Sequence, residues 1–196
     1  MTTHPESRRL TRALARAARK TVGFHGVVYR SASPRFASQG EIIAGSGARV
    51  VGGRWNPPRS FATVYLSLDP HAALDEALSH FRRFGLPLEK AMPRTFVAVA
   101  ADLHRVFNLT DRSVLQTLRL SRRKLTVEPW WEIQSAGGEA LTQALGRIGY
   151  EQGVEGLLAP SAARADGTNL VVFPGNLGPT SKLIVLSAGE LSPPWS

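Results

Sequence analysis

The sequence predicts a single α+β domain, and three observations lead to that prediction. The chain has 196 residues, the length of one ordinary domain, which buries roughly 70% of its unfolded surface in one core. Hydrophobic residues make up 43% and charged residues 20%, as is typical of globular proteins. Short apolar runs are mixed with helical patterns without the regular alternation of a doubly wound sheet. We therefore expect one compact domain built on a short-stranded mixed sheet.

The first third of the chain predicts one helix, one strand and a long loop. Residues 6–20 place Leu10 and Leu14 at helical spacing with arginines on the other face, which indicates an amphipathic helix. Residues 24–30 predict the first strand. Residues 31–59 hold five glycines and three prolines, so we expect a loop region with little regular structure. A loop of this length within one domain is usually functional.

The next segment predicts a strand followed by a helix. Residues 63–68 form a short apolar run, and Asp69-Pro70 then supplies an N-cap with proline at the first helical position. The helix is expected to end before Gly85. Its apolar stripe consists of Leu74, Ala77, Leu78 and Phe81.

The remaining chain predicts further strands and at least one helix. Residues 95–101 read as a β-branched strand, and a turn and a helix are expected over residues 103–124. Residues 138–148 predict a helix closed by Gly149. Three further short strands are expected at residues 156–159, 169–173 and 182–186.

The basic residues are concentrated near the N-terminus. The chain has 24 lysines and arginines against 15 acidic residues, a formal charge of +9 that favours anionic partners. Residues 1–23 contain six of these basic residues and a single acidic one, Glu6. A solvated surface helix and a helix that binds DNA or a protein are both consistent with this segment.

Several functional classes are excluded by what the sequence lacks. The absence of cysteine excludes disulfides, thiolate zinc sites and cysteine nucleophiles. None of the five histidines stands in an HExxH pair, and neither a GxSxG elbow nor a Walker-type phosphate loop is present. No apolar run approaches the roughly 20 residues needed to cross a bilayer, and the N-terminus does not fit a secretory signal. We therefore expect a cytoplasmic protein with no membrane partner.

Polar residues recur at the ends of the predicted strands. They form a series of short motifs whose order along the chain is more specific than any one of them. The series is Tyr29-Arg30, GGRWNP at residues 52–57, Tyr-Leu-Ser at residues 65–67, Glu76 on the following helix, GLLAPSA at residues 156–162 and NLVVF at residues 169–173.

In this order the motifs resemble the RES domain, a family named for its arginine, glutamate and serine. The resemblance covers about residues 26–186 and implies a fold similar to the ADP-ribosyltransferase toxins. It also implies a toxin of a type II toxin–antitoxin system that depletes NAD by hydrolysis or phosphorolysis and so arrests growth. We accordingly expect residues 24–196 to form the RES-type NAD-degrading domain and residues 1–23 to form a basic helical extension.

The resemblance also implies partners, substrates and residue roles. NAD is the substrate, with phosphate as a co-substrate and no cofactor, and an Xre-type antitoxin forms a hetero-oligomer that contacts DNA through the complex. The implied catalytic residues are Glu76, Tyr65 and Arg30. The implied substrate-binding residues are Arg30, Arg54, Tyr65, Ser161 and Asn169. The Pro58-Arg59 step departs from the glycine-containing turn expected there.

The residue types fit this chemistry. Nicotinamide leaves NAD as a neutral group, so one of the two carboxylates that most glycosidases need is not required. A single carboxylate such as Glu76 then stabilises the positive charge that develops on the ribose. Arg30 and Arg54 suit the diphosphate because a guanidinium offers planar bidentate donors.

Alternatives remain open from the sequence alone. Glu76 lies about 140° around the helix from the apolar stripe, beside His80 and Arg83, so it belongs either to a solvated face or to a cleft under residues 31–59. Transfer of ADP-ribose to a protein or nucleic acid is the rival activity. A non-enzymatic nucleic-acid-binding protein is the third reading, suggested by the basic N-terminal segment.

Overall fold

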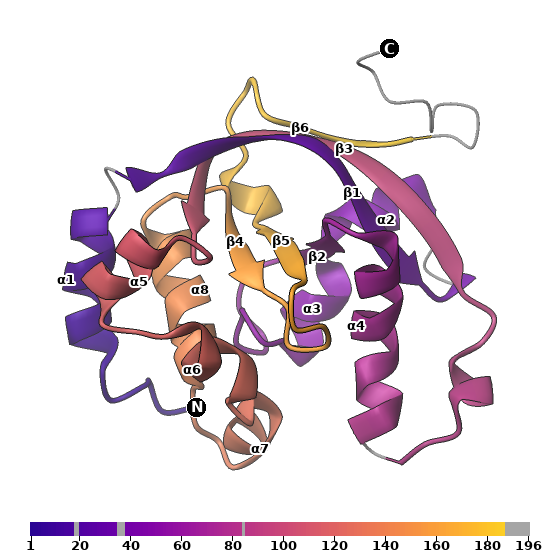
Figure 1. Ribbon diagram of the computed structural model, residues 1–196, viewed down its shortest axis with the longest axis horizontal. Coiled ribbons are helices and arrows are strands. Elements are labelled where there is room, and N and C mark those ends of the chain that lie inside the picture. Colours follow the sequence, from indigo (N-terminus) through magenta and orange to yellow (C-terminus); the bar gives the residue numbers. More distant parts are fainter. Residues whose placement is uncertain (18–19, 35–37, 84, 187–196) are drawn as a thin grey trace.

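The computed structural model describes residues 1–17, 20–34, 38–83 and 85–186. Within these residues the chain forms one mixed α/β domain around a six-stranded sheet (Figure 1). The strand order is β1-β2-β5-β4-β3-β6, and β1 also pairs with β3, so all strands except β6 form a closed ring. The strands are β1 (Val22–Ala32), β2 (Val64–Ser67), β3 (Thr95–Asn108), β4 (Gly156–Pro160), β5 (Thr168–Val172) and β6 (Lys182–Val185).

The sheet is mixed, as predicted, because one of its pairings is parallel. β3 runs parallel to β4, whereas the other strand pairs are antiparallel. The long β1–β3 pair runs from Val22 opposite Val106 to Ala32 opposite Thr95. In Figure 1 these two strands arch over the shorter strands β2, β4 and β5.

The prediction of a turn and a helix from residue 103 was wrong at its start, because β3 continues to Asn108. His104 and Arg105 interrupt the apolar pattern, so the sequence suggests that the strand ends. In the structure the Glu155 carboxylate accepts hydrogen bonds from the backbone N–H groups of both residues. The strand then pairs with β4 over residues 106–108. A distant partner therefore extends the strand past its polar interruption.

The helices pack on both sides of the sheet (Figure 1). Helices α1, α5, α6, α7 and α8 gather on one side, and α2 and α4 lie on the other. Their bounds are α1 (Ser7–Ala17), α2 (Gln39–Ala44), α3 (Ser46–Val51), α4 (Pro70–Arg83), α5 (Arg112–Leu118), α6 (Arg122–Val127), α7 (Trp130–Ser135) and α8 (Leu141–Glu151). No helix in the described part of the chain is long and apolar enough to cross a membrane.

Two hydrophobic cores hold these layers together. One core joins Leu10 and Leu14 of α1 to α5, α8, β4 and β5, and includes the buried Trp55. The other core lies between β1, β2, β3 and β5 and is covered by Ile42 of α2. The leucines of α1 thus belong to the same core as the centre of the sheet.

The expected loop over residues 31–59 contains two short helices, α2 and α3, which corrects the prediction. Ser38 caps α2 by accepting a hydrogen bond from the Glu41 N–H. Gly45, with a φ of 67°, ends α2 and begins α3. Two of the glycines that suggested irregular structure, Gly45 and Gly52, instead mark the boundaries of helices.

Gly149 does not close the last helix as predicted, because α8 continues to Glu151. A side chain at Gly149 would contact Val154, Leu157 and Phe173, so glycine at this position allows close packing.

Helix α4 begins as predicted, since the Asp69 carboxylate accepts the N–H of Ala72 at 2.9 Å.

Candidate functional site

A cavity of about 840 Å³ opens between α4, the ends of β1, β2 and β5, and the segment that joins α6 to α7. Its size suits a ligand larger than a single nucleoside. All but one of the site residues predicted from the sequence line this cavity. They are Arg30, Arg54, Tyr65, Glu76 and Asn169.

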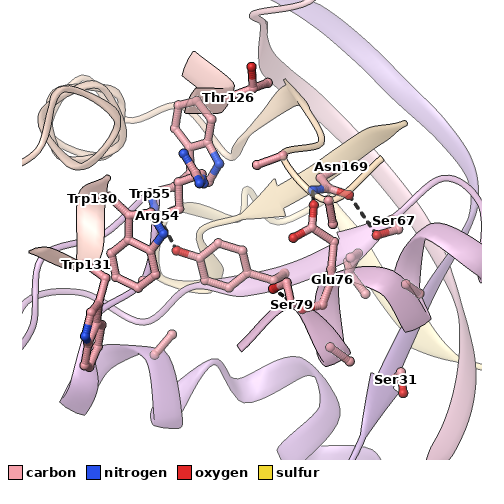
Figure 2. Close-up of a pocket in the computed structure, with 18 of the residues that line it drawn as sticks. Ser31, Arg54, Trp55, Ser67, Glu76, Ser79, Thr126, Trp130, Trp131 and Asn169 are labelled. Carbon is pink, nitrogen blue, oxygen red and sulfur yellow. Dashed lines mark hydrogen bonds between the residues drawn. The ribbon is translucent and has the colours of Figure 1, made fainter. Parts of the chain in front are cut away.

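Glu76 is held at one end of the cavity by a network of hydrogen bonds (Figure 2). Its Oε1 accepts from Ser161 Oγ at 2.6 Å and from Asn169 Nδ2 at 2.7 Å. Asn169 Oδ1 in turn accepts from Ser67 Oγ at 2.8 Å, which fixes the orientation of the amide. Among the described residues nothing donates to Oε2 of Glu76. One oxygen therefore positions the carboxylate, and the other is available to a ligand.

Ser161 lies behind Glu76 and does not line the cavity. Its side chain is buried, with 2% of the residue exposed. The hydroxyl accepts the N–H groups of Ala163 and Arg164, each at 3.1 Å, and donates to Glu76. In the structure Ser161 thus contacts the Glu76 carboxylate, whereas the family resemblance implied that Ser161 binds the substrate.

Helix α4 presents Glu76 to the cavity together with two small side chains. Ala73 and Ala77 flank Glu76 on the cavity wall at helical spacing. The predicted apolar stripe omitted Ala72 and Ala73, which are buried and extend the inward surface around the helix. The solvated-face alternative for Glu76 does not hold, because the carboxylate contacts β5 and the segment after β4. The side chains of His80 and Arg83 lie outside the described residues.

Tyr65 supports the GGRWNP segment. Its hydroxyl donates to Asn56 Oδ1 at 2.8 Å and accepts the Trp55 N–H at 2.9 Å. Asn56 also donates to the carbonyl of Ala48 at 2.8 Å, which ties the segment to α3. Burial of the phenol raises the pKa of Tyr65 above its ordinary value. The hydroxyl is therefore neutral and engaged, and Tyr65 borders the cavity through its ring.

Replacing Tyr65 with phenylalanine is expected to destabilise the protein by about 1–3 kcal/mol, because the Trp55 N–H and Asn56 Oδ1 lose a buried partner. Urea unfolding followed by fluorescence measures the change. Tyr150→Phe is the matched control, since Tyr150 stabilises chiefly by stacking on Phe61 at 4.2 Å, a contact that the substitution keeps. Equal stability of the two variants would contradict the role given to the Tyr65 hydroxyl.

Arg54 lies at the opposite end of the cavity from Glu76 (Figure 2). Its Nη1 donates to the carbonyls of Leu125 at 3.0 Å and Glu128 at 3.4 Å. These bonds join the GGRWNP segment to α6 and to the connection between α6 and α7. Arg54 is thereby oriented by backbone acceptors while it borders the cavity.

Two tryptophans that sequence reasoning missed line the same end of the cavity as Arg54 (Figure 2). Trp130 and Trp131 begin α7, and their rings meet edge to face with centroids 5.6 Å apart. The signal available in the sequence was the adjacent pair itself, because two consecutive tryptophans cannot both enter one core face of a helix. Together they offer aromatic surface to a planar ligand.

Arg94 is a further cavity residue that the sequence did not indicate. Its Nε donates to Ser31 Oγ at 3.1 Å and its Nη2 to the Ser31 carbonyl at 2.7 Å. The neighbouring Arg30 donates to the carbonyl of Ile42. Burial lowers the pKa of both guanidinium groups, and the positive charge of Arg94 lowers that of Arg30 further. Two cations thus share the part of the cavity where β1 ends.

Comparison with known protein families gives a match to the RES domain over residues 34–195. The chain belongs to the RES domain family. The match includes Arg54, Glu76 and Ser161, whereas Arg30 precedes it. This confirms the family resemblance seen in the order of the motifs.

Two curated relatives and one solved structure are similar to this RES protein. The relatives are the NAD(+) phosphorylases MbcT of Mycobacterium tuberculosis and Mycobacterium bovis, each 26% identical over 134 residues. The match covers 67% of this chain and 66% of each relative, so the chain spans just under two thirds of their length. The crystal structure of the M. tuberculosis MbcT–MbcA toxin–antitoxin complex is similar with a TM-score of 0.70 at 22% identity, over 91% of this chain and 89% of that one. This last likeness shows a shared fold.

Proposed function

We propose that this RES protein is a toxin of a type II toxin–antitoxin system that depletes NAD by cleaving the bond between nicotinamide and ribose. The observation that carries the proposal is the carboxylate of Glu76, fixed through one oxygen in a cavity that also holds Arg30 and Arg54. The curated relatives named NAD(+) phosphorylase support it, as does membership of the RES family. The relation to ADP-ribosyltransferase toxins is part of the same proposal.

The proposed reaction needs a group that stabilises positive charge on a sugar. The bond between ribose C1′ and the nicotinamide nitrogen breaks, and its electron pair stays on the departing neutral nicotinamide. Oxygen of water or phosphate forms the new bond to C1′. Glu76 accepts a hydrogen bond from a ribose hydroxyl through Oε2 and so stabilises the cationic transition state. Ser161 and Asn169 hold the carboxylate in place through Oε1.

The remaining residues would bind the rest of NAD. Arg30 and Arg54 border the cavity at separate places, which suits contacts with the diphosphate on two sides. Tyr65 lines the same cavity, and the charges of Arg54 and Glu76 both act on its hydroxyl. Trp130 and Trp131 would bind a base by stacking.

Replacing Trp131 with alanine is expected to raise the KM for NAD by about five- to thirtyfold with a smaller effect on kcat, since base stacking contributes about 1–2 kcal/mol to binding. Nicotinamide release at varied NAD concentration measures both constants. Trp131→Phe keeps an aromatic face and should restore much of the affinity. A KM for Trp131→Ala equal to that of the natural protein would exclude stacking at this position.

The proposed function is tested by incubating the protein with NAD, with and without phosphate, and identifying the products by mass spectrometry. Nicotinamide with ADP-ribose indicates hydrolysis, and nicotinamide with phosphorylated ADP-ribose indicates phosphorolysis. Nicotinamide that forms only when a protein or nucleic acid is present would establish transfer instead. A folded protein that leaves NAD intact under all these conditions overturns the proposal.

We further propose a cytoplasmic complex with an Xre-type antitoxin, through which the pair contacts DNA. The similar solved structure is that of a toxin–antitoxin complex, which supports an antitoxin partner for this chain. Co-expression of the chain with the protein encoded beside its gene, followed by gel filtration, tests this. A toxin that elutes alone while the neighbouring protein is present and folded would contradict it.

A further inference from the structure

Arg30 and Arg94 are two cations that share a cavity wall and have no carboxylate partner in the part of the chain that the structure describes. β1 pairs with β3 so that Ala32 lies opposite Thr95. Arg94 directly precedes β3 and therefore lies next to the end of β1. Arg94 donates hydrogen bonds to the carbonyl and the hydroxyl of Ser31, and Arg30 donates to the carbonyl of Ile42. Among the described residues no ion pair joins either guanidinium to Asp or Glu.

Such an arrangement is unfavourable unless an anion completes it. Bringing like charges together raises the energy of both, and the burial of Arg30 removes solvent that would otherwise screen its charge. The hydrogen bonds to Ser31 and Ile42 orient the guanidinium groups but involve neutral acceptors, so they leave the charge uncompensated. A guanidinium has five N–H donors, and Arg94 uses only Nε and Nη2 on Ser31. Its remaining donors are available to a ligand in the cavity.

We propose that Arg94, together with Arg30, forms a binding subsite for a phosphate group. An inorganic phosphate dianion, or the two singly charged phosphates of a diphosphate together, matches the two positive charges, whereas a carboxylate would neutralise only one of them. Two sources of phosphate suit the proposed reaction: the diphosphate of NAD and inorganic phosphate that acts as the acceptor. The choice of these two ligands rests on the proposed function. The inference adds Arg94, which the motif series does not contain, and it requires that the bound group carry negative charge.

Binding measurements test the subsite without any need for catalysis. Inorganic phosphate and ADP-ribose are titrated separately by calorimetry at constant ionic strength. Arg94→Ala is expected to weaken the binding of at least one of these probes about tenfold or more, because one charge-assisted contact is lost. Arg112→Ala is the matched control, since Arg112 is exposed on α5 and does not border the cavity. Unchanged affinity of Arg94→Ala for both probes overturns the subsite.

Kinetics on the active protein identify which phosphate occupies the subsite. A raised KM for inorganic phosphate with an unchanged KM for NAD assigns it to the acceptor, and the reverse result assigns it to the diphosphate. Arg94→Gln removes the charge but keeps an amide N–H donor of the kind that the Ser31 carbonyl accepts, so it helps to separate a folding defect from loss of the ligand. Arg94→Lys should recover part of the affinity because it restores charge without the planar fork.

The two proposals fail in different ways. If the protein binds ADP-ribose in a manner that depends on Arg94 but never releases nicotinamide, the proposed activity is wrong and the subsite stands. If the protein cleaves NAD and Arg94→Gln retains the KM of the natural protein for both NAD and phosphate, the subsite is wrong and the activity stands.

Discussion

Replacing Glu76 with glutamine is expected to lower the kcat for NAD cleavage by about a hundredfold to a thousandfold, the range for loss of one preorganised electrostatic contact. Glutamine has nearly the same shape, and its Oε1 still accepts from Ser161 and Asn169. What it lacks is the negative charge that stabilises the ribose cation. The free energy of unfolding should therefore change by less than about 2 kcal/mol.

The neighbouring residue supplies a control on the same helix. Asp75 pairs with Arg82 at 3.0 Å and with Arg164 at 3.7 Å, and it does not border the cavity. Asp75→Asn removes the same charge from α4 and should leave the cleavage rate within about twofold, because partly exposed ion pairs contribute little. Single-turnover assays of nicotinamide release compare the variants. A Glu76→Gln protein with natural kcat would show that the proposed chemistry does not depend on this acid.

Replacing Gly146 with alanine is expected to destabilise the protein by about 3 kcal/mol or more, because a methyl group there would overlap the carbonyl of Trp55. The overlap involves two backbone segments, α8 and the GGRWNP segment, and neither has a flexible side chain that can move aside. Relief of the clash would displace Trp55 and, with it, Arg54. We therefore expect loss of NAD cleavage together with loss of stability.

A glycine elsewhere in a helix makes the matched comparison. Gly47 lies in α3, and a methyl group added there would meet open space. Gly47→Ala should stabilise the protein by about 0.5–1 kcal/mol, since alanine favours the helix. Urea unfolding measures both variants. If Gly146→Ala lies within about 0.5 kcal/mol of the natural protein, the contact between α8 and Trp55 is not as close as described.

Most elements could be predicted from local patterns, and the errors have specific causes. The start of α4 follows from Asp69-Pro70, whose capping chemistry depends on neighbouring residues alone. The glycines at positions 45 and 149 were assigned the wrong roles. Glycine marks a turn, a helix boundary or a close contact, and which of these applies depends on what packs against it.

The sequence led to residues that line one cavity, but it did not indicate the contacts between them. The motif order led to Arg30, Arg54, Tyr65, Glu76 and Asn169, which share one cavity. Arg94 and the tryptophans of α7 carry no motif, so they became visible only once the cavity was assembled. Their roles in binding, like those of the motif residues, stay predictions until the variants are measured.

Local sequence was sufficient for the α+β class and for most strand and helix positions, because spacing and capping are properties of neighbouring residues. The order of the motifs along the whole chain was sufficient for the family. Folding was required to join β1 to β3 into a closed sheet and to bring Ser161 and Asn169 onto Glu76 across 85 and 93 residues of chain. The physical reason is that periodicity reports which face of an element is buried. The partner on that face is chosen by packing between segments that are remote in the chain.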